Sequence, residues 1–274
     1  MKIDGKLIAS EILLDLKKRV DVLKEKGITP HLYVILLIND DATLSYIKQK
    51  KLKSEEIGAK ITIDESNPNV TTFELLDKIE KLNNDNTVHG IIVQRPLPKN
   101  LDEEKIKNAI IPEKDVDGFR IDSKFNAPVA EAVLKIVETA VENQNILDFL
   151  KSKKITVIGK GVTAGKPIIN LFEKLNIKIN IVDSKTKDKE KVLKESDIII
   201  SAVGKDIVKK EELKQGVILV GVGMHTESGK LKGDYNEEEI KDKVSFYTPT
   251  PGGVGPVNVA YLMKNLIETT ENLL

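Results

Sequence analysis

Apolar residues along the chain follow two spacings, one typical of helices and one typical of buried strands. Helical spacing covers residues 6–26, 43–57 and 72–82. Continuous apolar runs of strand length cover residues 32–38, 60–63 and 90–94. Apolar strands that alternate with helices are typical of a parallel sheet covered on both faces. The first part of the chain is therefore predicted to form an α/β domain.

A second alternating series follows a segment of turn residues at 112–122 and a predicted connecting helix at 130–142. Strands are predicted over residues 154–158, 178–182, 197–203, 217–222 and 244–247, and helices over residues 166–175, 187–194 and 257–274. The whole pattern predicts two α/β domains, residues 1–125 and residues 126–256. We expect the second domain to hold a Rossmann-like parallel sheet.

The charge balance and the missing residue types narrow the chemistry. Among 274 residues, 43 Lys and Arg stand against 43 Asp and Glu, so there is no net charge and no overall attraction for nucleic acid. The absence of cysteine excludes disulfides, thiolate metal sites and cysteine nucleophiles. The three histidines, His31, His89 and His225, lie in unrelated contexts, so we expect no zinc centre and no other metal.

Hydrophobic runs in the chain are short. None approaches the ~18 apolar residues of a membrane span. The first residues, Met1 to Lys6, lack the apolar segment of a secretory signal. We therefore expect a cytoplasmic protein that contacts neither a membrane nor nucleic acid.

A glycine-rich turn links the first strand of the second series to its helix. The residues are Gly159-Lys160-Gly161-Val162-Thr163-Ala164, a G-x-G-x-x-A pattern in the strand–turn–helix context of dinucleotide-binding domains. Gly159 turns without a steric penalty, Gly161 lets backbone N–H groups approach a pyrophosphate, and the helix N-terminus attracts the phosphates. An ordinary turn that contains glycines is the alternative, and the five strands of the series favour the dinucleotide.

Charged residues after the second strand of this series bear on the choice of cofactor. Asp183 lies close to the ~20-residue spacing of the ribose-binding acid, where it accepts from a 2′-OH and favours NAD. An alternative site for the 2′-phosphate of NADP is offered by the residues around the same place, Lys160, Ser184, Lys185 and Lys187. The residues alone leave this preference open.

Polar residues in the first domain are candidates for substrate chemistry. Tyr46 and Lys50 lie four apart on a predicted helix and share a face, although the lysine-rich surroundings favour plain helix surface. Short-chain dehydrogenases use such a pair, but there it lies downstream of the glycine turn, whereas here it lies upstream. Gln94 follows a predicted strand, at the end where α/β domains bind ligands.

Two loops have unusual compositions. Asp115 and Asp117 precede Gly118, where a common Asx turn is the alternative to a ligand-binding role. Residues 248–256 combine prolines, which stiffen the loop, with glycines that leave its surface bare. We expect this second loop to support a flat ligand.

Together these motifs resemble the bifunctional methylenetetrahydrofolate dehydrogenase/methenyltetrahydrofolate cyclohydrolase family. The resemblance runs from about Gly5 to Ile267, nearly the whole chain. In the first domain it is carried by Ser45-Tyr46-Ile47-Lys48-Gln49-Lys50 and by residues 93–98 and 112–118. In the second domain it is carried by residues 159–167, 201–204, 233–234 and 251–256.

The resemblance implies oxidation of 5,10-methylenetetrahydrofolate with NADP, or else NAD, and hydrolysis of the product to 10-formyltetrahydrofolate. These reactions belong to one-carbon metabolism and purine biosynthesis. The resemblance also implies a folate domain and a nucleotide domain with a cleft between them. The closing helix 257–274 is then expected to pack on the folate domain, and the protein to form a homodimer.

The resemblance further implies roles for individual residues. Tyr46 stacks on the folate, Asp117 binds the pterin, and Lys50, held by Gln94, serves the hydrolysis. Further folate contacts are expected from Pro251, Gly252, Gly253 and Val254. Cofactor contacts are expected from Gly159, Lys160, Gly161, Val162, Asp183, Ser184, Lys185, Ala202, Val203 and Gly204.

Several positions depart from the residues usual in that family. Lys160-Gly161 stands for Arg-Ser, Asp183 for His, Arg95 for Leu, Gly221 for Asp, Asn258 for Thr, and residues 126–129 for Pro-Cys-Thr-Pro. Most of these positions lie in the nucleotide domain. They therefore bear on the preference for NADP more than on the reaction.

Other function classes fit parts of the sequence. An unrelated nicotinamide-dependent dehydrogenase keeps the turn at 159–165 but has no use for Tyr46, Lys50 and Gln94. A regulator that only binds folate or nucleotide has no use for Lys50 beside Gln94. A dehydrogenase without the hydrolase step leaves Lys50 as a substrate-binding residue.

Overall fold

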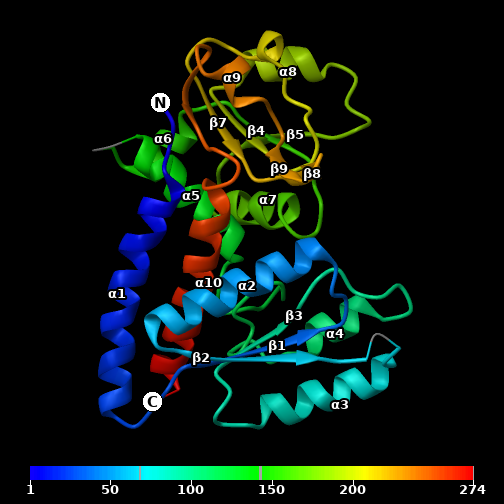
Figure 1. Cartoon of the computed structure of the whole chain (residues 1–274). Coiled ribbons are helices and arrows are strands. Elements are labelled where there is room, and N and C mark those ends of the chain that lie inside the picture. The colour runs from blue at the N-terminus through cyan, green and yellow to red at the C-terminus, as the bar shows by residue number, and fades with distance from the viewer. Residues whose placement is uncertain (68, 142–143, 274) are drawn as a thin grey trace. The chain divides into compact units, whose positions relative to one another are not determined.

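The computed structural model of the chain describes residues 1–67, 69–141 and 144–273 (Figure 1). Unit 1 comprises Met1–Ala9 and Val129–Asn258, and unit 2 comprises Ser10–Pro128 and Val259–Leu274. Two long helices, α1 (Gly5–Glu25) and α10 (Val254–Asn272), contribute residues to both units. The predicted domain bounds at residues 125 and 256 stay a prediction, because compactness rather than function defines these units.

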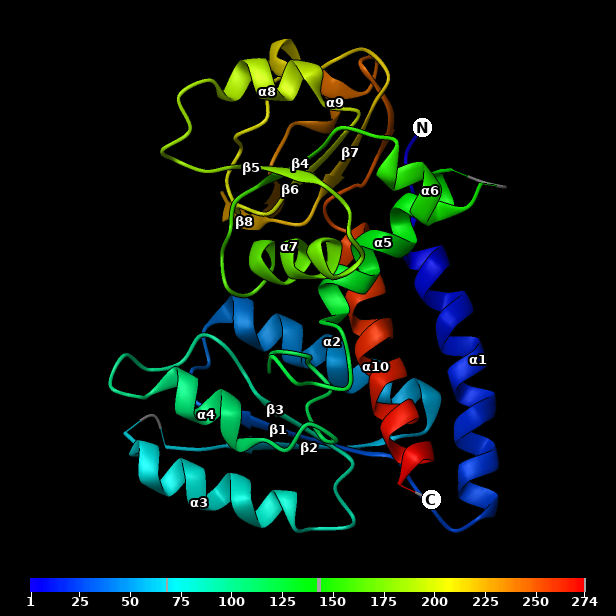
Figure 2. The same ribbon diagram turned by 180° about the vertical axis from the view of Figure 1, so that it is seen from behind.

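Unit 2 is built on parallel strands in the order β2-β1-β3. They are β1 (His31–Leu36), β2 (Lys60–Glu65) and β3 (Gly90–Val93). Helices α3 (Thr72–Asn83) and α4 (Glu103–Ala109) cover one face, where Ile35, Ile79 and Ile91 share a buried core. Helix α2 (Asp41–Ile57) and the unit's part of α10 cover the other face (Figure 2).

Local signals set the ends of α2 and α3. The Asp40 side chain accepts a hydrogen bond from the Thr43 N–H at 2.8 Å, which caps the start of α2. Gly58 ends α2 with φ +82°, a left-handed conformation that glycine adopts without a steric penalty. Thr71 and Glu74 form a reciprocal capping box at the start of α3. These ends fix where α2 presents its buried face.

Unit 1 is built on parallel strands in the order β10-β7-β6-β4-β5. They are β4 (Ile155–Ile158), β5 (Ile179–Val182), β6 (Ile198–Ser201), β7 (Val217–Gly221) and β10 (Val244–Tyr247). Helices α5 (Pro128–Ala140) and α7 (Gly165–Lys174) lie on one face, and α8 (Lys189–Glu195) and α9 (Glu237–Ile240) on the other (Figures 1 and 2). A short helix, α6 (Ile146–Lys151), precedes β4, and the 3₁₀ turn η1 (Lys210–Glu212) precedes β7.

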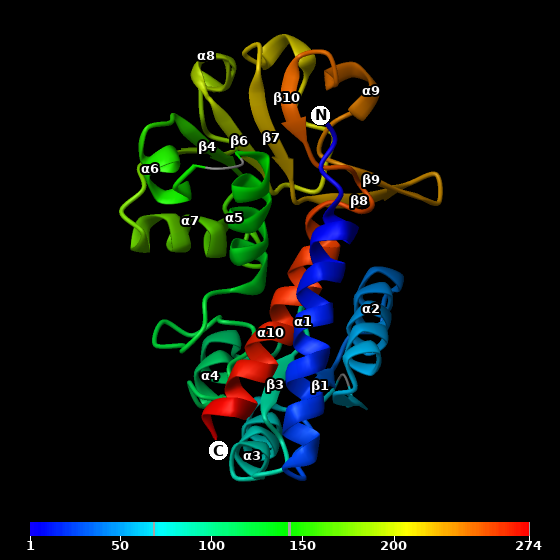
Figure 3. The same cartoon turned by 90° about the vertical axis from the view of Figure 1, so that its left-hand side faces the viewer.

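Two further segments complete unit 1. Strands β8 (Met224–Glu227) and β9 (Lys230–Gly233) form an antiparallel hairpin that extends from the sheet (Figure 3). The first residues of the chain run beside β10, where the Ile3 N–H donates to Tyr247 O at 2.8 Å and the Tyr247 N–H donates to Met1 O at 3.0 Å. The start of the chain is therefore tied to unit 1 by backbone hydrogen bonds.

In each sheet, the direction in which successive strands are added reverses at one strand. In unit 2 this strand is β1, with β2 on one side and β3 on the other. In unit 1 it is β4, with β5 on one side and β6 on the other. Ligands of open parallel sheets bind at the carboxyl ends of the strands at such switch points. Ligand binding is therefore expected at the loops after β1, β3, β4 and β6.

The predicted α/β class and the strand–helix alternation are confirmed, with several differences in detail. Helices α4 and α6 and the β8–β9 hairpin were not predicted. The edge strands β2 and β5 carry exposed residues, among them Asn180, although buried strands were expected. The closing helix begins earlier than predicted, at Val254. The predicted ends of two helices, Glu142 and Leu274, lie outside the described residues.

Among residues 1–67, 69–141 and 144–273, no helix has the length and apolar character needed to cross a bilayer. The predicted cytoplasmic location stays a prediction.

Candidate active site

Lys50 is a buried lysine whose ammonium group is held by the end of β3. It lies on α2, and only 8% of its surface is exposed. Its Nζ donates to Gln94 Oε1 at 2.8 Å. Gln94 is itself oriented, because its side-chain Nε2 donates to Arg95 O at 2.9 Å and its backbone N–H donates to Ile35 O at 2.9 Å. The structure thus brings Lys50 and Gln94 together at the switch point of unit 2.

The environment of Lys50 changes its acid–base behaviour. Removal from water lowers the pKa of Lys50, because burial penalises the charged ammonium. The nearby Asp117 carboxylate acts in the opposite direction and raises this pKa. A lysine in this balance exchanges a proton more readily than a surface lysine does.

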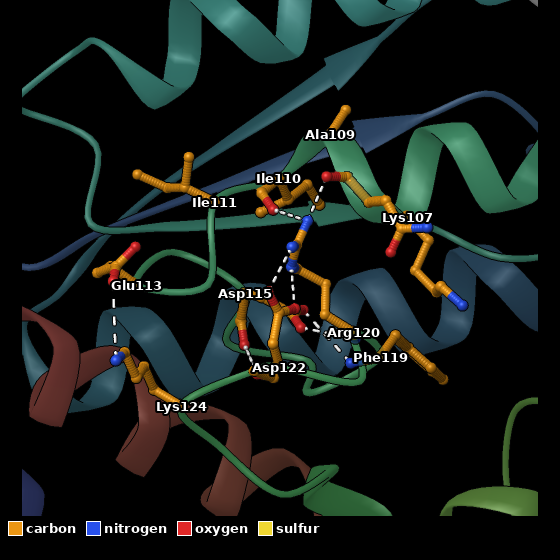
Figure 4. Close-up of polar contacts among 12 residues, drawn as sticks. Lys107, Ala109, Ile110, Ile111, Glu113, Asp115, Phe119, Arg120, Asp122 and Lys124 are labelled. Carbon is orange, nitrogen blue, oxygen red and sulfur yellow. Dashed lines mark hydrogen bonds and ion pairs between the residues drawn. The ribbon is translucent and has the colours of Figure 1, made fainter.

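The loop that carries Asp117 is organised by two other residues (Figure 4). Asp115 is buried, which raises its pKa, and its carboxylate accepts from the backbone N–H groups of Phe119 and Arg120 at 3.4 and 2.9 Å. The Arg120 side chain donates to Ile110 O at 3.0 Å and pairs with Asp122. Of the two aspartates before Gly118, Asp115 therefore takes the turn-forming role.

Asp117 keeps its carboxylate available. Within the described part of the chain it forms no hydrogen bond or ion pair, and it lines a small cavity together with Arg95 and Phe119. Gly118 follows with φ +66°, and a Cβ there would lie 2.7 Å from Ala127 N, so a larger residue does not fit. The loop thus presents one free acid on a fixed backbone.

Arg95 also lies in this region, although no role was predicted for it. Its guanidinium lies over the Phe119 ring, 4.4 Å from the centroid, and forms an ion pair with Glu103. The only signal in the sequence was its departure from the leucine usual in the resembling family. Asp117 therefore lies in the field of two cations, Lys50 and Arg95.

Tyr46 lies one helical turn before Lys50 on α2. Burial raises the pKa of its hydroxyl, so the ring stays neutral over the physiological range. The side chain is half-buried rather than enclosed. A neutral, half-buried aromatic ring is suited to stacking on a planar heterocycle.

The glycine turn of unit 1 has the backbone that the sequence predicts. Gly159 has φ +90°, and a Cβ there would lie 2.7 Å from Ala202 O and 3.1 Å from Val203 Cγ2. A Cβ on Gly165 would overlap Gly159 O, whereas a Cβ on Gly161 would meet open space. The turn is thus tightly packed at Gly159 and Gly165 and open at Gly161, next to the N-terminus of α7. This shape fits the pyrophosphate of a dinucleotide.

An ion pair lies beside this turn. Lys160 Nζ is 2.7 Å from Asp183 Oδ2, and the Lys185 N–H donates to Asp183 Oδ1 at 2.9 Å. The Lys160 ammonium, with the Lys185 N–H, lowers the pKa of Asp183. Ser184 and Lys185 are exposed next to the pair. Asp183 is therefore ionised, and the positive charge of Lys160 balances its negative charge.

The loop at 251–254 belongs to unit 1 and follows β10. Gly253 is buried, and a Cβ there would lie 2.6 Å from Pro249 O, so its missing side chain serves packing within the unit. Gly252 has φ +104° and faces more open space, and Pro251 is exposed. Val254 is buried at the first turn of α10. The expectation of a bare surface thus applies to Gly252 and not to Gly253.

No group of three or more His, Asp or Glu side chains in the described part of the chain is placed to hold a metal ion. His31 and His89 are buried in unit 2, where the His31 N–H donates to His89 Nδ1 at 3.2 Å. The expectation of a metal-free reaction stays a prediction.

Comparison with known proteins links both units to one family. The profile described as "Tetrahydrofolate dehydrogenase/cyclohydrolase, catalytic domain" matches residues 3–117. The profile described as "Tetrahydrofolate dehydrogenase/cyclohydrolase, NAD(P)-binding domain" matches residues 128–274. The chain belongs to the tetrahydrofolate dehydrogenase/cyclohydrolase family.

Individual members of the family are similar over nearly their full length. The bifunctional protein FolD of Staphylococcus carnosus is 42% identical over 275 residues, which cover 97% of this chain and 95% of that protein. The crystal structure of the Campylobacter jejuni enzyme FolD, a methylenetetrahydrofolate dehydrogenase/cyclohydrolase, is 35% identical with a TM-score of 0.93, covering 100% of this chain and 99% of that one. The Trypanosoma brucei enzyme, solved with NADP cofactor and inhibitor, is 28% identical with a TM-score of 0.90, covering 99% and 97%.

One departure from the usual family residues has a structural explanation. Gly221 stands where the family usually has aspartate, and a Cβ there would lie 2.9 Å from the Tyr235 ring. The Tyr235 hydroxyl fills this space and donates to Thr248 O at 2.6 Å. Gly221 and Tyr235 therefore form one packing unit within the family fold.

Proposed function

We propose that this chain oxidises 5,10-methylenetetrahydrofolate to 5,10-methenyltetrahydrofolate with a nicotinamide dinucleotide and then hydrolyses the product to 10-formyltetrahydrofolate. The observation that carries the proposal is the buried Lys50 bonded to Gln94, in a chain that matches both domains of the family. An unrelated nicotinamide-dependent dehydrogenase has no need of this lysine. The tight glycine turn of unit 1 is the proposed binding place of the cofactor that the first step requires.

Lys50 is the proposed proton carrier of the hydrolysis. Water adds to the methenyl carbon, and the neutral Lys50 amine takes one water proton as the C–O bond forms. The resulting hydroxyl then loses its proton to solvent and becomes the formyl C=O as the bond between that carbon and N5 breaks. The Lys50 ammonium returns its proton to N5, which regenerates the neutral amine. Gln94 supports this role because its Oε1 accepts from Lys50 Nζ and fixes the direction of the amine.

The dehydrogenation relies on orientation rather than on proton transfer. A bound nicotinamide dinucleotide would supply the hydride acceptor for the methylene carbon of the folate, and the folate nitrogens would stabilise the resulting cation. We propose that Tyr46 stacks on the folate and that the free Asp117 carboxylate binds the pterin. Residues 251–254 are proposed to add contacts to the folate. The main cost of aligning two reacting rings is the loss of entropy, and fixed contacts of this kind reduce the part of that cost that falls in the reaction step.

We propose that the cofactor is NADP ahead of NAD. Asp183 is neutralised by Lys160, so it offers less repulsion to a 2′-phosphate than a lone carboxylate does. Lys160, Ser184 and Lys185 are exposed beside it and provide donors for that phosphate. Residues 159–162 are proposed to hold the pyrophosphate, and residues 202–204 to contact the remainder of the cofactor. The T. brucei relative, solved with NADP, supports the choice.

The test supplies purified protein with 5,10-methylenetetrahydrofolate and either NADP or NAD, and follows reduced cofactor and 10-formyl product separately. We expect both products, with NADP the faster cofactor, after correction for spontaneous hydrolysis in an enzyme-free blank. Reduced cofactor without catalysed formation of the formyl product would leave a dehydrogenase alone. No reaction with either cofactor would overturn the proposal and leave a binding protein.

A further inference from the structure

Asp234 is a fully buried carboxylate that collects hydrogen bonds from one short segment of unit 1. It follows β9, and none of its surface is exposed. Its Oδ2 accepts from Ser201 Oγ at 2.7 Å and from the Val203 N–H at 3.0 Å. Its Oδ1 accepts from the N–H groups of Gly204 and Lys205 at 2.7 and 3.0 Å. One charge thus binds four donors within five residues of chain.

Two further features fix Asp234 and the chain next to this segment. The backbone oxygen of Asp234 accepts from the N–H groups of Ile207 and Val208 at 2.9 and 3.0 Å. A Cβ on Gly223 would overlap both the Asp234 carboxylate and Gly204 N, so only glycine leaves room for this contact. The position of the Asp234 carboxylate is therefore fixed both by its own backbone hydrogen bonds and by the space left at Gly223.

The segment that Asp234 holds lies at the switch point of the unit 1 sheet. The Ala202 N–H donates to Ile158 O at 2.8 Å, at the carboxyl end of β4. Val203 packs beside Gly159 of the glycine turn, and 36% of its surface is exposed. Residues 202–205 thus form the second wall of the place where the dinucleotide is proposed to bind. Asp234 itself lies behind this wall.

We infer that Asp234 is a positioning residue for the nicotinamide dinucleotide, which it serves by fixing residues 202–205 without touching the ligand. This inference rests on the proposed cofactor site. Because the N–H groups of Val203, Gly204 and Lys205 are committed to Asp234, the carbonyl oxygens and the Val203 side chain are left for the ligand. A loop that is ordered before binding loses less conformational freedom when the ligand arrives.

Asp234→Asn tests the inference with little change in volume. In either orientation of the amide, its NH₂ group faces two of the four donors, so at least the Val203 N–H or the pair from Gly204 and Lys205 loses its acceptor. We expect the dissociation constant for NADPH, measured by fluorescence titration, to rise by about tenfold or more. Hydrolysis of 5,10-methenyltetrahydrofolate without cofactor is expected to stay within about twofold.

Ser201→Ala is the matched control. It removes the hydroxyl donor to the same carboxylate but leaves the three backbone bonds of the loop. We expect it to lower thermal stability while the NADPH dissociation constant stays within about twofold. A purely structural role of Asp234 predicts that both variants lose stability without any difference in NADPH affinity, and that result would overturn the inference.

Gly223→Ala keeps the charge and displaces the segment by overlap with the carboxylate. We expect it to weaken NADPH binding in the same direction as Asp234→Asn, so the inference stays testable if one variant folds poorly. Unchanged NADPH affinity in a folded Gly223→Ala protein, with active hydrolase, would also count against the inference. Failure of the wild-type protein to bind NADPH would instead overturn the proposed function.

Discussion

A lysine on an exposed helix face is protonated at neutral pH and holds its proton firmly. Lys50 differs because α2 buries it and Gln94 accepts from its ammonium group. Burial lowers the pKa of Lys50, and Asp117 limits how far this pKa falls. The balance between burial and one carboxylate thus decides the pH range in which the neutral amine is available for the hydrolysis.

Asp117→Asn is predicted to move the acidic limb of the cyclohydrolase pH profile to lower pH. Asp117 stabilises the ammonium form of Lys50, so its neutralisation lowers the pKa of Lys50 further. The neutral amine then persists at lower pH than in the wild type. The measurement is kcat against pH at saturating 5,10-methenyltetrahydrofolate, because the variant is also expected to bind folate more weakly.

Asp122→Asn serves as its control, since this exposed carboxylate of the same loop pairs with Arg120. The control profile is expected to match that of the wild type. An acidic limb that stays in place in Asp117→Asn, or that moves to higher pH, would contradict the proposed electrostatic link between Asp117 and Lys50.

Lys160→Ala is predicted to raise the KM for NADP by about tenfold and to change the KM for NAD little. The substitution removes a donor to the 2′-phosphate and also leaves Asp183 without its cation, and both effects act against that phosphate. Initial rates with each cofactor provide the measurement. Lys191→Ala, an exposed lysine on α8, is the control. Equal changes for the two cofactors would show that Lys160 does not recognise the phosphate.

Residue positions in unit 2 were only partly predictable from the sequence. The spacing of Tyr46 and Lys50 predicted that they share a helix face, but the sequence around Lys50 favoured a surface lysine. Only the family motif indicated a catalytic role for Lys50. Lys50 contacts Gln94, 44 residues further along the chain, and no local pattern reveals such a contact. The contact of Arg95 with Phe119 is likewise tertiary, so the sequence offered only an unusual residue.

At the scale of elements, long segments with strong apolar periodicity were predicted and short polar ones were not. Helix α4 buries only Ile106 and offers too few apolar positions for a helical pattern. The β8–β9 hairpin is largely exposed, and its residues lack the apolar alternation of a half-buried strand. Both elements are stabilised by tertiary contacts rather than by a local pattern. The β8–β9 hairpin also positions Asp234, which directly follows β9.

The glycine turn gives a prediction about two positions of one element. Gly165→Ala is expected to lower the free energy of unfolding by ~1–3 kcal/mol, because the new methyl group overlaps Gly159 O. Gly161→Ala is expected to leave stability within ~0.5 kcal/mol of the wild type, since its Cβ meets open space. The same methyl group occupies the proposed phosphate place and is expected to weaken NADPH binding. Denaturant unfolding and NADPH titration measure the two effects.

Gly216→Ala is a control for backbone strain, since Gly216 has φ +80° and open space around its Cβ position. It is expected to lower stability without any change in NADPH affinity. Loss of stability in Gly161→Ala with unchanged NADPH affinity would contradict the account of the turn as a phosphate cradle.

At the scale of the whole molecule, one chain provides two folded units with separate chemical tasks. Unit 2 holds Lys50, Gln94 and Asp117, and unit 1 holds the glycine turn and the segment fixed by Asp234. The alternation of strands and helices predicted both sheets, because their central strands are almost wholly apolar. The predicted homodimer, the cytoplasmic location and the link to purine biosynthesis stay predictions.

Separate tasks imply that the two activities can be lost independently. Lys50→Met keeps the length and apolar stem of the side chain and removes the amine that exchanges the proton. The dehydrogenase step needs orientation and cofactor, so it is expected to continue at least in part. Lys51→Met, at an exposed neighbouring position, is the matched control and is expected to retain both activities.

The most direct measurement follows the hydrolysis of 5,10-methenyltetrahydrofolate without cofactor, alongside the dehydrogenase rate of the same preparations. The account predicts that Lys50→Met loses the hydrolysis by about 100-fold or more while it still reduces NADP. Hydrolysis within about fivefold of the wild type would contradict the proton-carrying role of Lys50. Equal loss of both activities in a folded variant that binds folate would contradict the proposed division of tasks.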